Sequence, residues 1–585
     1  MGSTAEATVG AELGVLAGAG HSDGERAPAE TRPRRSFAVP LVAIGVVLAV
    51  FAFAPFIIAA VDAAHRHRDS LGVDSWDPMD GLQYLAWVRD AHNGLIRNLF
   101  GSGRDGAVFL HPMWSPSGWV QAATGVSDTA IMAFWTAVGA LVLLAGCARL
   151  VVQQLPPERP TARVIALCLA LFGGLTPLVL LLPAIDIAAP NDARLAGEDL
   201  ISAASLWGYA PMAIAVGLMP FAIEGVSRLI DGRRDRRTVL GTAALGLLVA
   251  WLHPWQGESL IAVSAGLAAW WLYDRSAARS RWGARSRGGA RARPAAGPPD
   301  RRPGGRHDRR RLMSGLGAPL LVLVATAAPL LYYLILSKVD AGWAVAELAD
   351  RAATIPWPLI VLCVAPLALL AVIAGRRAGG DHAARGLALW PLATLLVVAG
   401  TRSGQDRALV GIGIPVAVLL VRVWPTGLHR ARWVLAAAAG VAATLVPAGI
   451  YVAETINGLG SPYFTTVAEL KPSDVRASAL AARASGEQPI LAPAALGTAI
   501  PALTDAASWV GHPIWTPDYG SRAQRSGALF AGSMTGPQAR AFVRAVGTRA
   551  LVEPCGWTAR LEPALAPLGF RQVQVGCSRV YLLPG

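Results

Sequence analysis

Two carboxylates near the start of the chain are the first residues whose type and spacing could support chemistry. The segment SWDPMDGLQYLAWVRDA places Asp77 and Asp80 just beyond a long apolar run. A partly desolvated carboxylate at a membrane surface is suited to accept a proton from a hydroxyl group. The alternative is structural: Asp77 would cap the following helix, and Asp80 would bind the local backbone.

Two arginines in a polar segment between short apolar runs form a second candidate. The sequence VAGTRSGQDRALVG places Arg402 and Arg407 near membrane depth. Charged side chains there are costly unless they are paired or line a polar cavity. Each guanidinium presents a planar fork of donors that suits a phosphate. We therefore expect either a phosphate site or a tight turn whose arginines reach lipid headgroups.

A third polar segment, LHPWQGES, interrupts an apolar region at residues 252–259. His253 ends one apolar run and Glu258 begins the next. Short helices broken by polar residues mark cavities in membrane proteins. His253 would orient a substrate, or it would be a satisfied structural histidine. His111, in FLHPMWSP, is a similar but weaker candidate.

The cysteines and the remaining acidic residues give little support for a metal site. Cys555 and Cys577 could form a disulfide if their part of the chain faces an oxidising compartment. Neither a CxxC motif nor a Cys/His cluster indicates zinc. The acidic residues of 184–208 could hold a divalent ion, but their spacing matches no metal motif. A divalent metal thus stays open, and no cofactor is predicted firmly.

The composition shows what kind of scaffold must position these residues. The chain has 585 residues, of which 54% are hydrophobic and 15% charged, against about 25% charged in soluble domains. The mean hydropathy is +0.44. The net charge of +14 would normally suggest nucleic acid as a partner. Most of that charge lies in short segments between apolar runs, without a basic and aromatic motif, so we expect no nucleic-acid partner.

Apolar runs predict a polytopic α-helical membrane protein. A helix that crosses about 30 Å of hydrocarbon needs about 20 apolar residues. About eleven runs qualify: 37–61, 129–148, 164–183, 209–227, 239–253, 258–273, 315–336, 357–374, 387–401, 408–422 and 433–453.

The arginine bias of the loops predicts the orientation in the cell membrane. Arg32, Arg34 and Arg35 precede the first run, which places the N-terminus in the cytoplasm. The other Arg-rich loops then alternate consistently, and an odd number of spans places the C-terminus outside. The basic stretch 275–311 would touch anionic headgroups.

The same patterns divide the chain into parts. Residues 1–35 are predicted as a disordered cytoplasmic tail, 36–453 as the membrane domain with a disordered basic loop at 274–312, and 454–585 as an extracytoplasmic α/β domain. In that last domain we expect helices at 473–485, 537–547 and 557–568, and strands at 489–495, 549–554, FRQVQVG and SRVYLLP. Residues 81–100 read as an amphipathic helix lying at the membrane interface.

Together these features resemble the GT-C superfamily of membrane glycosyltransferases. Its members include protein O-mannosyltransferases, lipid A aminoarabinose transferases and oligosaccharyltransferase catalytic subunits. They carry an aspartate after the first span, in a long outer loop, as at Asp77 and Asp80. The segment WVGHPIWTPDYGSRAQRSGALFAGSM (509–534) looks like the periplasmic end of actinobacterial members. The first loop lacks a clear DxD motif, because its two aspartates are spaced differently.

The resemblance implies a sugar donor linked to polyprenyl phosphate, with its tail between helices and its phosphate at the outer surface. Asp77 or Asp80 would deprotonate an acceptor hydroxyl, and its oxygen would displace the phosphate with inversion. Arg402 and Arg407 would stabilise the leaving phosphate. The implied partners are this donor, membrane lipid, and a glycan, lipid or protein acceptor; hexosyl and pentosyl transfer are both possible.

The secondary substrate-binding candidates are His253, Glu258, His512 and Arg522. The last two lie in the expected outer domain with Trp515, Asp518 and Tyr519, where aromatic faces and polar edges suit sugars. The alternative is a folded turn with buried aromatic rings. If the resemblance holds, the acidic and guanidinium groups should face each other across one outward-open cavity about 10 Å wide.

Two other classes of function are compatible with the spans. A transporter or lipid flippase often carries inverted repeats, but no matching pair of broken helices is seen in the two halves of this chain. A non-catalytic subunit of an envelope-assembly complex is the third class.

Overall fold

A computed structural model of the chain describes residues 35–73, 78–101, 106–173, 201–288, 305–352, 381–401, 405–423, 467–557 and 559–584, with scattered residues at 368–377 and 435–464. Asp77 and Arg402 lie outside the described residues. The same holds for nearly all of the expected spans 357–374 and 433–453 and of the tail 1–35.

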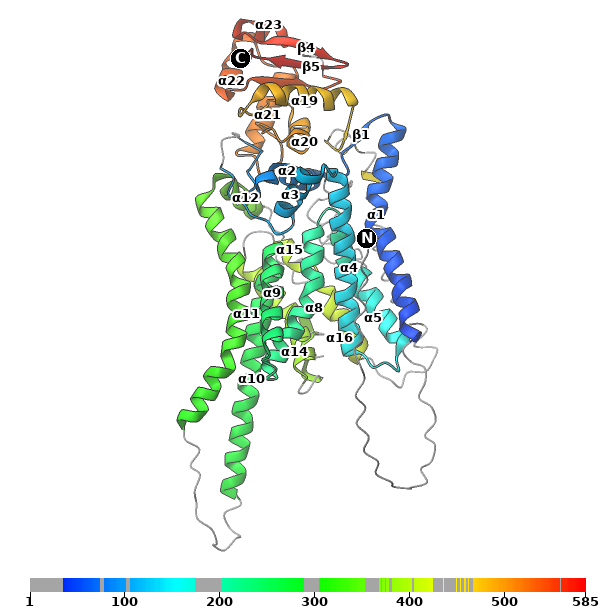
Figure 1. Cartoon of the computed structure of the whole chain (residues 1–585), viewed down its shortest axis with the longest axis vertical. Coiled ribbons are helices and arrows are strands. Elements are labelled where there is room, and N and C mark those ends of the chain that lie inside the picture. Colours follow the sequence, from blue (N-terminus) through cyan, green and yellow to red (C-terminus); the bar gives the residue numbers. More distant parts are fainter. Residues whose placement is uncertain are drawn as a thin grey trace, which may run out of the picture.

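In the described part of the chain, nine helices form a bundle whose longest members run along the long axis of the molecule (Figure 1). Each covers one of the other nine apolar runs, wholly or in part, because a long apolar segment satisfies its backbone groups in lipid only by forming a helix. They are α1 (Arg35–His65), α4 (Asp128–Gln154), α5 (Pro160–Phe172), α8 (Ala210–Ile230), α9 (Arg236–Leu252), α10 (Pro254–Gly288), α11 (Gly305–Val339), α14 (His382–Gly400) and α16 (Gly413–Val423).

Five of the described helices are long and apolar enough to cross a membrane by length and composition: α1, α4, α8, α11 and α14. Glycines allow two of them to pack closely, since a Cβ added to Gly146 of α4 would lie 2.0 Å from the carbonyl oxygen of Gly217 in α8. Small residues at such contacts are typical of helix packing in membranes. α10 and α11 also extend into both ends of the 274–312 segment, where Ala and Arg favour helix.

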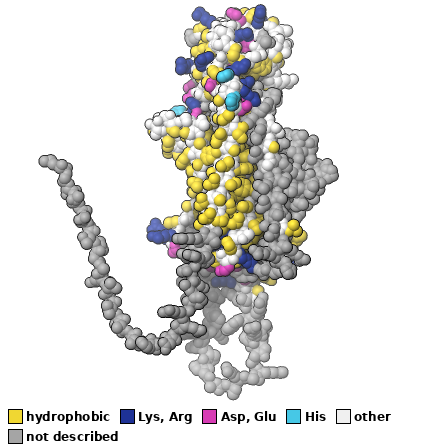
Figure 2. Space-filling model, turned by 90° about the vertical axis from the view of Figure 1, so that its right-hand side faces the viewer, with side chains coloured by type: hydrophobic (Ala, Val, Ile, Leu, Met, Phe, Trp, Pro, Cys, Tyr) yellow, Lys and Arg dark blue, Asp and Glu magenta, His cyan; other side chains and the backbone are white. Residues whose placement is uncertain are grey.

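Apolar side chains cover the outside of the bundle. Val39 of α1 and Leu334 of α11 are 75% and 55% exposed, and many other large apolar residues of these two helices point outward as well. Figure 2 shows this apolar surface along the middle of one face, with charged side chains gathered at the two ends. A surface of this kind is stable only against lipid. The chain is therefore a multi-pass membrane protein; which end faces the cytoplasm stays a prediction.

Three shorter helices, α2 (Pro78–Asp90), α3 (Trp114–Thr124) and α12 (Ala341–Ala352), lie between the bundle and the C-terminal part (Figure 1). The helix expected over 81–100 is shorter than predicted, and its second side does not face water. α2 ends at Asp90, a short 3-10 turn follows, and Gly94 turns the chain at φ 88°. Most of α2 is buried, including Leu82 and Val88. The C-terminal part of the chain covers the face that was expected to meet water.

The C-terminal part is an α/β unit at one end of the bundle (Figure 1). An antiparallel sheet joins β3 (Ala550–Glu553), β5 (Ser578–Leu582) and β4 (Arg571–Val575), in that order. Parallel bridges then join Leu551 to Leu491, Ile490 to Ser508 and Ser508 to Phe100. The segment after α2 therefore continues the sheet of the C-terminal part.

The helices of this unit are α19 (Pro472–Ser485), α20 (Ala494–Thr504), α21 (Tyr519–Phe530), α22 (Gly536–Val546) and α23 (Glu562–Leu565). α19, α22 and the last three strands match the expected elements. The strand expected at 489–495 is only a bridge at 490–491, because α20 begins at Ala494. The helix expected at 557–568 is confined to 562–568.

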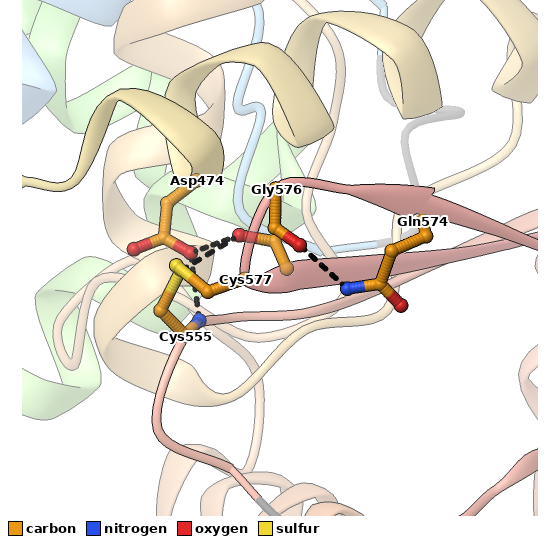
Figure 3. The surroundings of a disulfide bond; sticks show 6 residues. Asp474, Cys555, Gln574, Gly576 and Cys577 are labelled. Atoms are coloured by element: carbon orange, nitrogen blue, oxygen red, sulfur yellow. Dashed lines mark hydrogen bonds between the residues drawn. A yellow bond between two sulfur atoms is a disulfide. The ribbon is translucent and has the colours of Figure 1, made fainter.

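Cys555 and Cys577 lie as a bonded pair at the edge of this sheet, with their Cα atoms 5.0 Å apart (Figure 3). Asp474, at the start of α19, binds both flanks of the pair. Its carboxylate accepts the Cys555 N–H at 2.8 Å and the Ser578 hydroxyl at 2.7 Å. The pair thus fixes the loop after β3 to the turn between β4 and β5.

We expect Cys555 and Cys577 to resist alkylation in denaturant without reductant, whereas Cys147 and Cys168 react. The two cysteines close a loop across 22 positions, which corresponds to about 3 kcal/mol in the chain-entropy model. The variant with serine at both positions should therefore unfold at a lower temperature. Peptide mass spectrometry of the alkylated protein makes the test, and alkylation of both Cys555 and Cys577 would show that no bond forms.

Candidate functional site

A cavity of about 350 Å³ lies where α2, α10, α11 and α12 meet the C-terminal part. Five polar candidates from the sequence line it: Asp80, His111, His253, Glu258 and Arg407. Groups separated by more than 300 positions in the chain thus share one wall. The lining is otherwise rich in aromatic rings, so polar groups are few and concentrated.

Asp80 reaches the cavity from the first turn of α2. Pro78 starts this helix, where its missing N–H is not needed. The Asp80 side chain is buried, and its Oδ1 lies 2.9 Å from Nε2 of His512. The Asp80 carboxylate therefore contacts a residue that lies 432 positions away in the chain. His512 itself is 1% exposed and is not part of the cavity wall.

His253 lies between the end of α9 and the start of α10, and it is 5% exposed. Among the described residues, neither of its ring nitrogens has a hydrogen-bond partner. A buried ring with two unsatisfied nitrogens is costly unless a ligand or water completes it. Because His253 lines the cavity, both nitrogens are available to a polar group held there.

Arg407 reaches the same wall from the short helix α15 (Gln405–Leu409). Its guanidinium carbon lies 5.3 Å from the ring centre of Trp255, in the first turn of α10. Gln256 connects the two elements by donating from Nε2 to the carbonyl oxygen of Val410 at 2.7 Å. This bond holds the α15 turn against the start of α10, and so places Arg407 beside His253.

His111 is a stronger candidate than its sequence context indicated. Its Nδ1 accepts the N–H groups of Met113 and Trp114, each at 3.3 Å, and its ring stacks on Trp114. Burial lowers the pKa of His111 to about 3. The ring is therefore neutral at physiological pH and carries its proton on Nε2. Since His111 lines the cavity, it offers an uncharged donor there.

Arg522 does not line this cavity. It donates to the carbonyl oxygen of Trp509 at 2.8 Å and packs over that residue's ring. Trp515, by contrast, lines the cavity and meets Trp87 and Trp343 edge to face.

Sequence reasoning missed several lining residues although a periodic signal exists for them. Gln83, Tyr84 and Trp87 line the cavity with Asp80, and their spacing of three, four and seven places them on one face of a helix. Trp343 and Glu347 of α12 show the same spacing of four. Polar and aromatic residues at helical spacing from a candidate base could therefore have predicted the other residues that line the cavity.

A second, more open cavity of about 760 Å³ adjoins the first. The two share Glu258, Glu347 and Thr401 in their walls. Arg351 of α12 and residues of α10 and α14, among them Ile261 and Leu396, line the rest. Both cavities thus combine a few charged side chains with apolar ones. In the described part of the chain, no three His, Cys, Asp or Glu side chains gather as metal ligands would; metal dependence stays open.

No protein-family model and no curated protein matches the chain. Solved structures do resemble it. One is the archaeal oligosaccharyltransferase AglB of Archaeoglobus fulgidus, in complex with an inhibitory peptide and a dolichol-phosphate; it has 14% identity and a TM-score of 0.43 over 93% of this chain and 74% of that one. Another is ArnT of Cupriavidus metallidurans bound to undecaprenyl phosphate, with 14% identity and a TM-score of 0.43 over 94% of this chain and 99% of that one.

Proposed function

We propose that the chain is a membrane glycosyltransferase that moves a sugar from a polyprenyl-phosphate donor to an acceptor hydroxyl. The observation that supports this most is the shared cavity, where the carboxylate of Asp80 and the guanidinium of Arg407 occupy one wall with the unpartnered ring of His253. Such a set provides both a base for a hydroxyl and donors for a phosphate.

In the proposed reaction, Asp80 accepts the proton of the acceptor hydroxyl. The resulting oxygen attacks the anomeric carbon on the face opposite the phosphate. The bond between that carbon and the phosphate oxygen breaks, and its electron pair leaves with the polyprenyl phosphate. One substitution of this kind inverts the anomeric configuration. The acceptor gains the sugar, and the proton stays on Asp80 until water removes it.

Negative charge grows on the leaving phosphate, and three features of the cavity wall would stabilise it. Arg407 supplies a fixed positive charge and several donors. His253 supplies an N–H from a ring that is otherwise unsatisfied. The start of α10 adds the positive end of a helix dipole, since Pro254 and Trp255 lie in the wall. Preorganised groups of this kind lower the barrier because they need no rearrangement as charge develops.

The adjoining groove suits the lipid part of the donor. Ile261 of α10 and Leu396 of α14 give it apolar wall, and Glu258 lines both this groove and the first cavity. A polyprenyl tail would lie along those two helices while its phosphate enters the first cavity. We assign the acceptor only as a hydroxyl compound, and hexosyl and pentosyl donors both fit this proposal.

The test is a transfer assay with the purified protein in liposomes that contain radiolabelled polyprenyl-phosphate sugars. We expect label to pass from the lipid phase to an acceptor, with the product in the opposite anomeric configuration to the donor. A matched assay follows movement of the intact donor between the two leaflets. Leaflet exchange without sugar transfer, across a panel of donors, would contradict the proposal and favour a flippase.

A further inference from the structure

We infer that His512 is a positioning residue, which holds the carboxylate of Asp80 in place so that the C-terminal part of the chain completes the reaction site. The inference rests on the proposed function, because it assigns a role in that reaction. The sequence analysis treated His512 as a substrate-binding candidate. In the structure it lies behind Asp80 and outside the cavity wall, so it would act through that carboxylate.

Hydrogen bonds fix the tautomer of His512. The backbone N–H of Ile514 donates to its Nδ1 at 3.1 Å. A nitrogen that accepts such a bond carries no proton, so the proton of the neutral ring lies on Nε2. Nε2 is the atom 2.9 Å from Asp80 Oδ1. The ring therefore donates to the carboxylate, and a donor favours the charged form that a base requires.

The turn that carries His512 is held by its own backbone. The His512 carbonyl oxygen accepts the N–H of Thr516 at 2.9 Å, and the Thr516 hydroxyl accepts the N–H of Gly511 at 3.1 Å. Before the turn, the Ser508 hydroxyl donates to the carbonyl oxygen of Val510 at 2.8 Å. A ring that is buried in such a turn has little freedom to follow a moving carboxylate.

The same turn is tied to the segment that carries Asp80. The N–H of Ser508 donates to the carbonyl oxygen of Leu99 at 2.8 Å. The Asn98 side chain donates from Nδ2 to the carbonyl oxygen of Trp515 at 3.0 Å. At the other end of α2, Arg89 donates from Nε to the carbonyl oxygen of Ala502 at 2.9 Å. These bonds therefore fix the position of His512 relative to Asp80, although the two residues lie 432 positions apart.

The alternative is that the pair only stabilises the fold, as a buried carboxylate and its donor can. The two roles differ in what they predict for catalysis. A purely structural pair changes stability and leaves the turnover of the remaining folded protein intact. A positioning residue changes kcat, because small displacements of a reacting group cost on the order of 10²-fold in rate.

The experiment compares His512→Leu with His512→Gln in the liposome assay. We expect His512→Leu to lower kcat by on the order of 10²-fold, with the KM for the donor unchanged. His512→Gln should recover much of the loss, because the Gln amide can donate to Asp80 from a similar position. His92→Leu is the matched control, since His92 is exposed in the short turn that follows α2. Wild-type kcat in folded His512→Leu would overturn the inference.

A second measurement separates this inference from the proposed function. Thermal unfolding is followed for His512→Leu, Asp80→Asn and the double variant, whether or not sugar is transferred. Coupled residues give a shift in Tm for the double variant that differs from the sum of the single shifts. Additive shifts would show that the contact does not exist. If the wild-type protein transfers no sugar but the Tm shifts are non-additive, the contact exists and the proposed function is contradicted. The catalytic role of His512 is then contradicted as well.

Discussion

Asp80→Asn should lower kcat by about 10²- to 10⁴-fold, the range expected for loss of a general base. The amide has the shape of the carboxylate and its oxygen can still accept the proton of His512 Nε2, so the fold around α2 should persist. It has no basic site for the hydroxyl proton, however. The KM for the donor should therefore change little, because the donor phosphate is expected at Arg407 and His253 and not at Asp80.

Asp128→Asn is the matched control for this prediction. Asp128 lies at the start of α4, near the same end of the bundle, and forms an ion pair with Arg89. It does not line the candidate cavity. Loss of such a partly exposed pair costs about 1 kcal/mol or less, and kcat should stay at the wild-type value. Equal losses in Asp80→Asn and Asp128→Asn would mean that the effect is one of stability.

Arg407→Ala should produce the second large effect, with kcat reduced by about 10²- to 10³-fold and the KM for the donor raised. The reason is that Arg407 would bind the donor phosphate in the ground state and stabilise it more strongly as charge develops. Arg407→Lys keeps the positive charge but loses the planar fork of donors. It should therefore restore the KM for the donor more fully than kcat. Initial rates over a range of donor concentrations separate the two constants.

The control for Arg407 is Arg233→Ala. Arg233 is exposed in the loop between α8 and α9, at the far end of the bundle. Both substitutions remove one positive charge from a protein of net charge +14, so any general electrostatic effect on the anionic donor is shared. If Arg407→Ala matched Arg233→Ala in both constants, the assignment of Arg407 to the phosphate would fail.

The sequence predicted the local parts of this fold better than their arrangement. The membrane helices follow from apolar length, and β4 and β5 follow from short alternating segments around a turn. α20 was missed because AALGTAIPALT reads as an apolar segment without helical alternation: it is buried on nearly all sides. The burial of α2 could not be predicted, because the surface that covers it comes from residues such as Ala502, 413 positions beyond Arg89.

For the candidate site, too, single residues were predicted from the sequence but their contacts were not. Asp80, His253 and Arg407 were identified because a charged or polar group near membrane depth requires a reason. The bond between Asp80 and His512 had no sequence signal, since neither the distance of 432 positions nor the tautomer is encoded locally. The helical stripe Asp80, Gln83, Tyr84 and Trp87 was present in the sequence, but it was read as one face of an interfacial helix.

The position of the donor phosphate tests the central claim most directly. A structure of the protein with undecaprenyl phosphate bound in a lipid nanodisc would locate it. We predict the phosphate within about 3 Å of donor atoms of Arg407 and His253, in the cavity that Asp80 lines and with the tail along α10 and α14. A phosphate bound at the other end of the bundle, or on a surface that Asp80 does not share, would contradict the account.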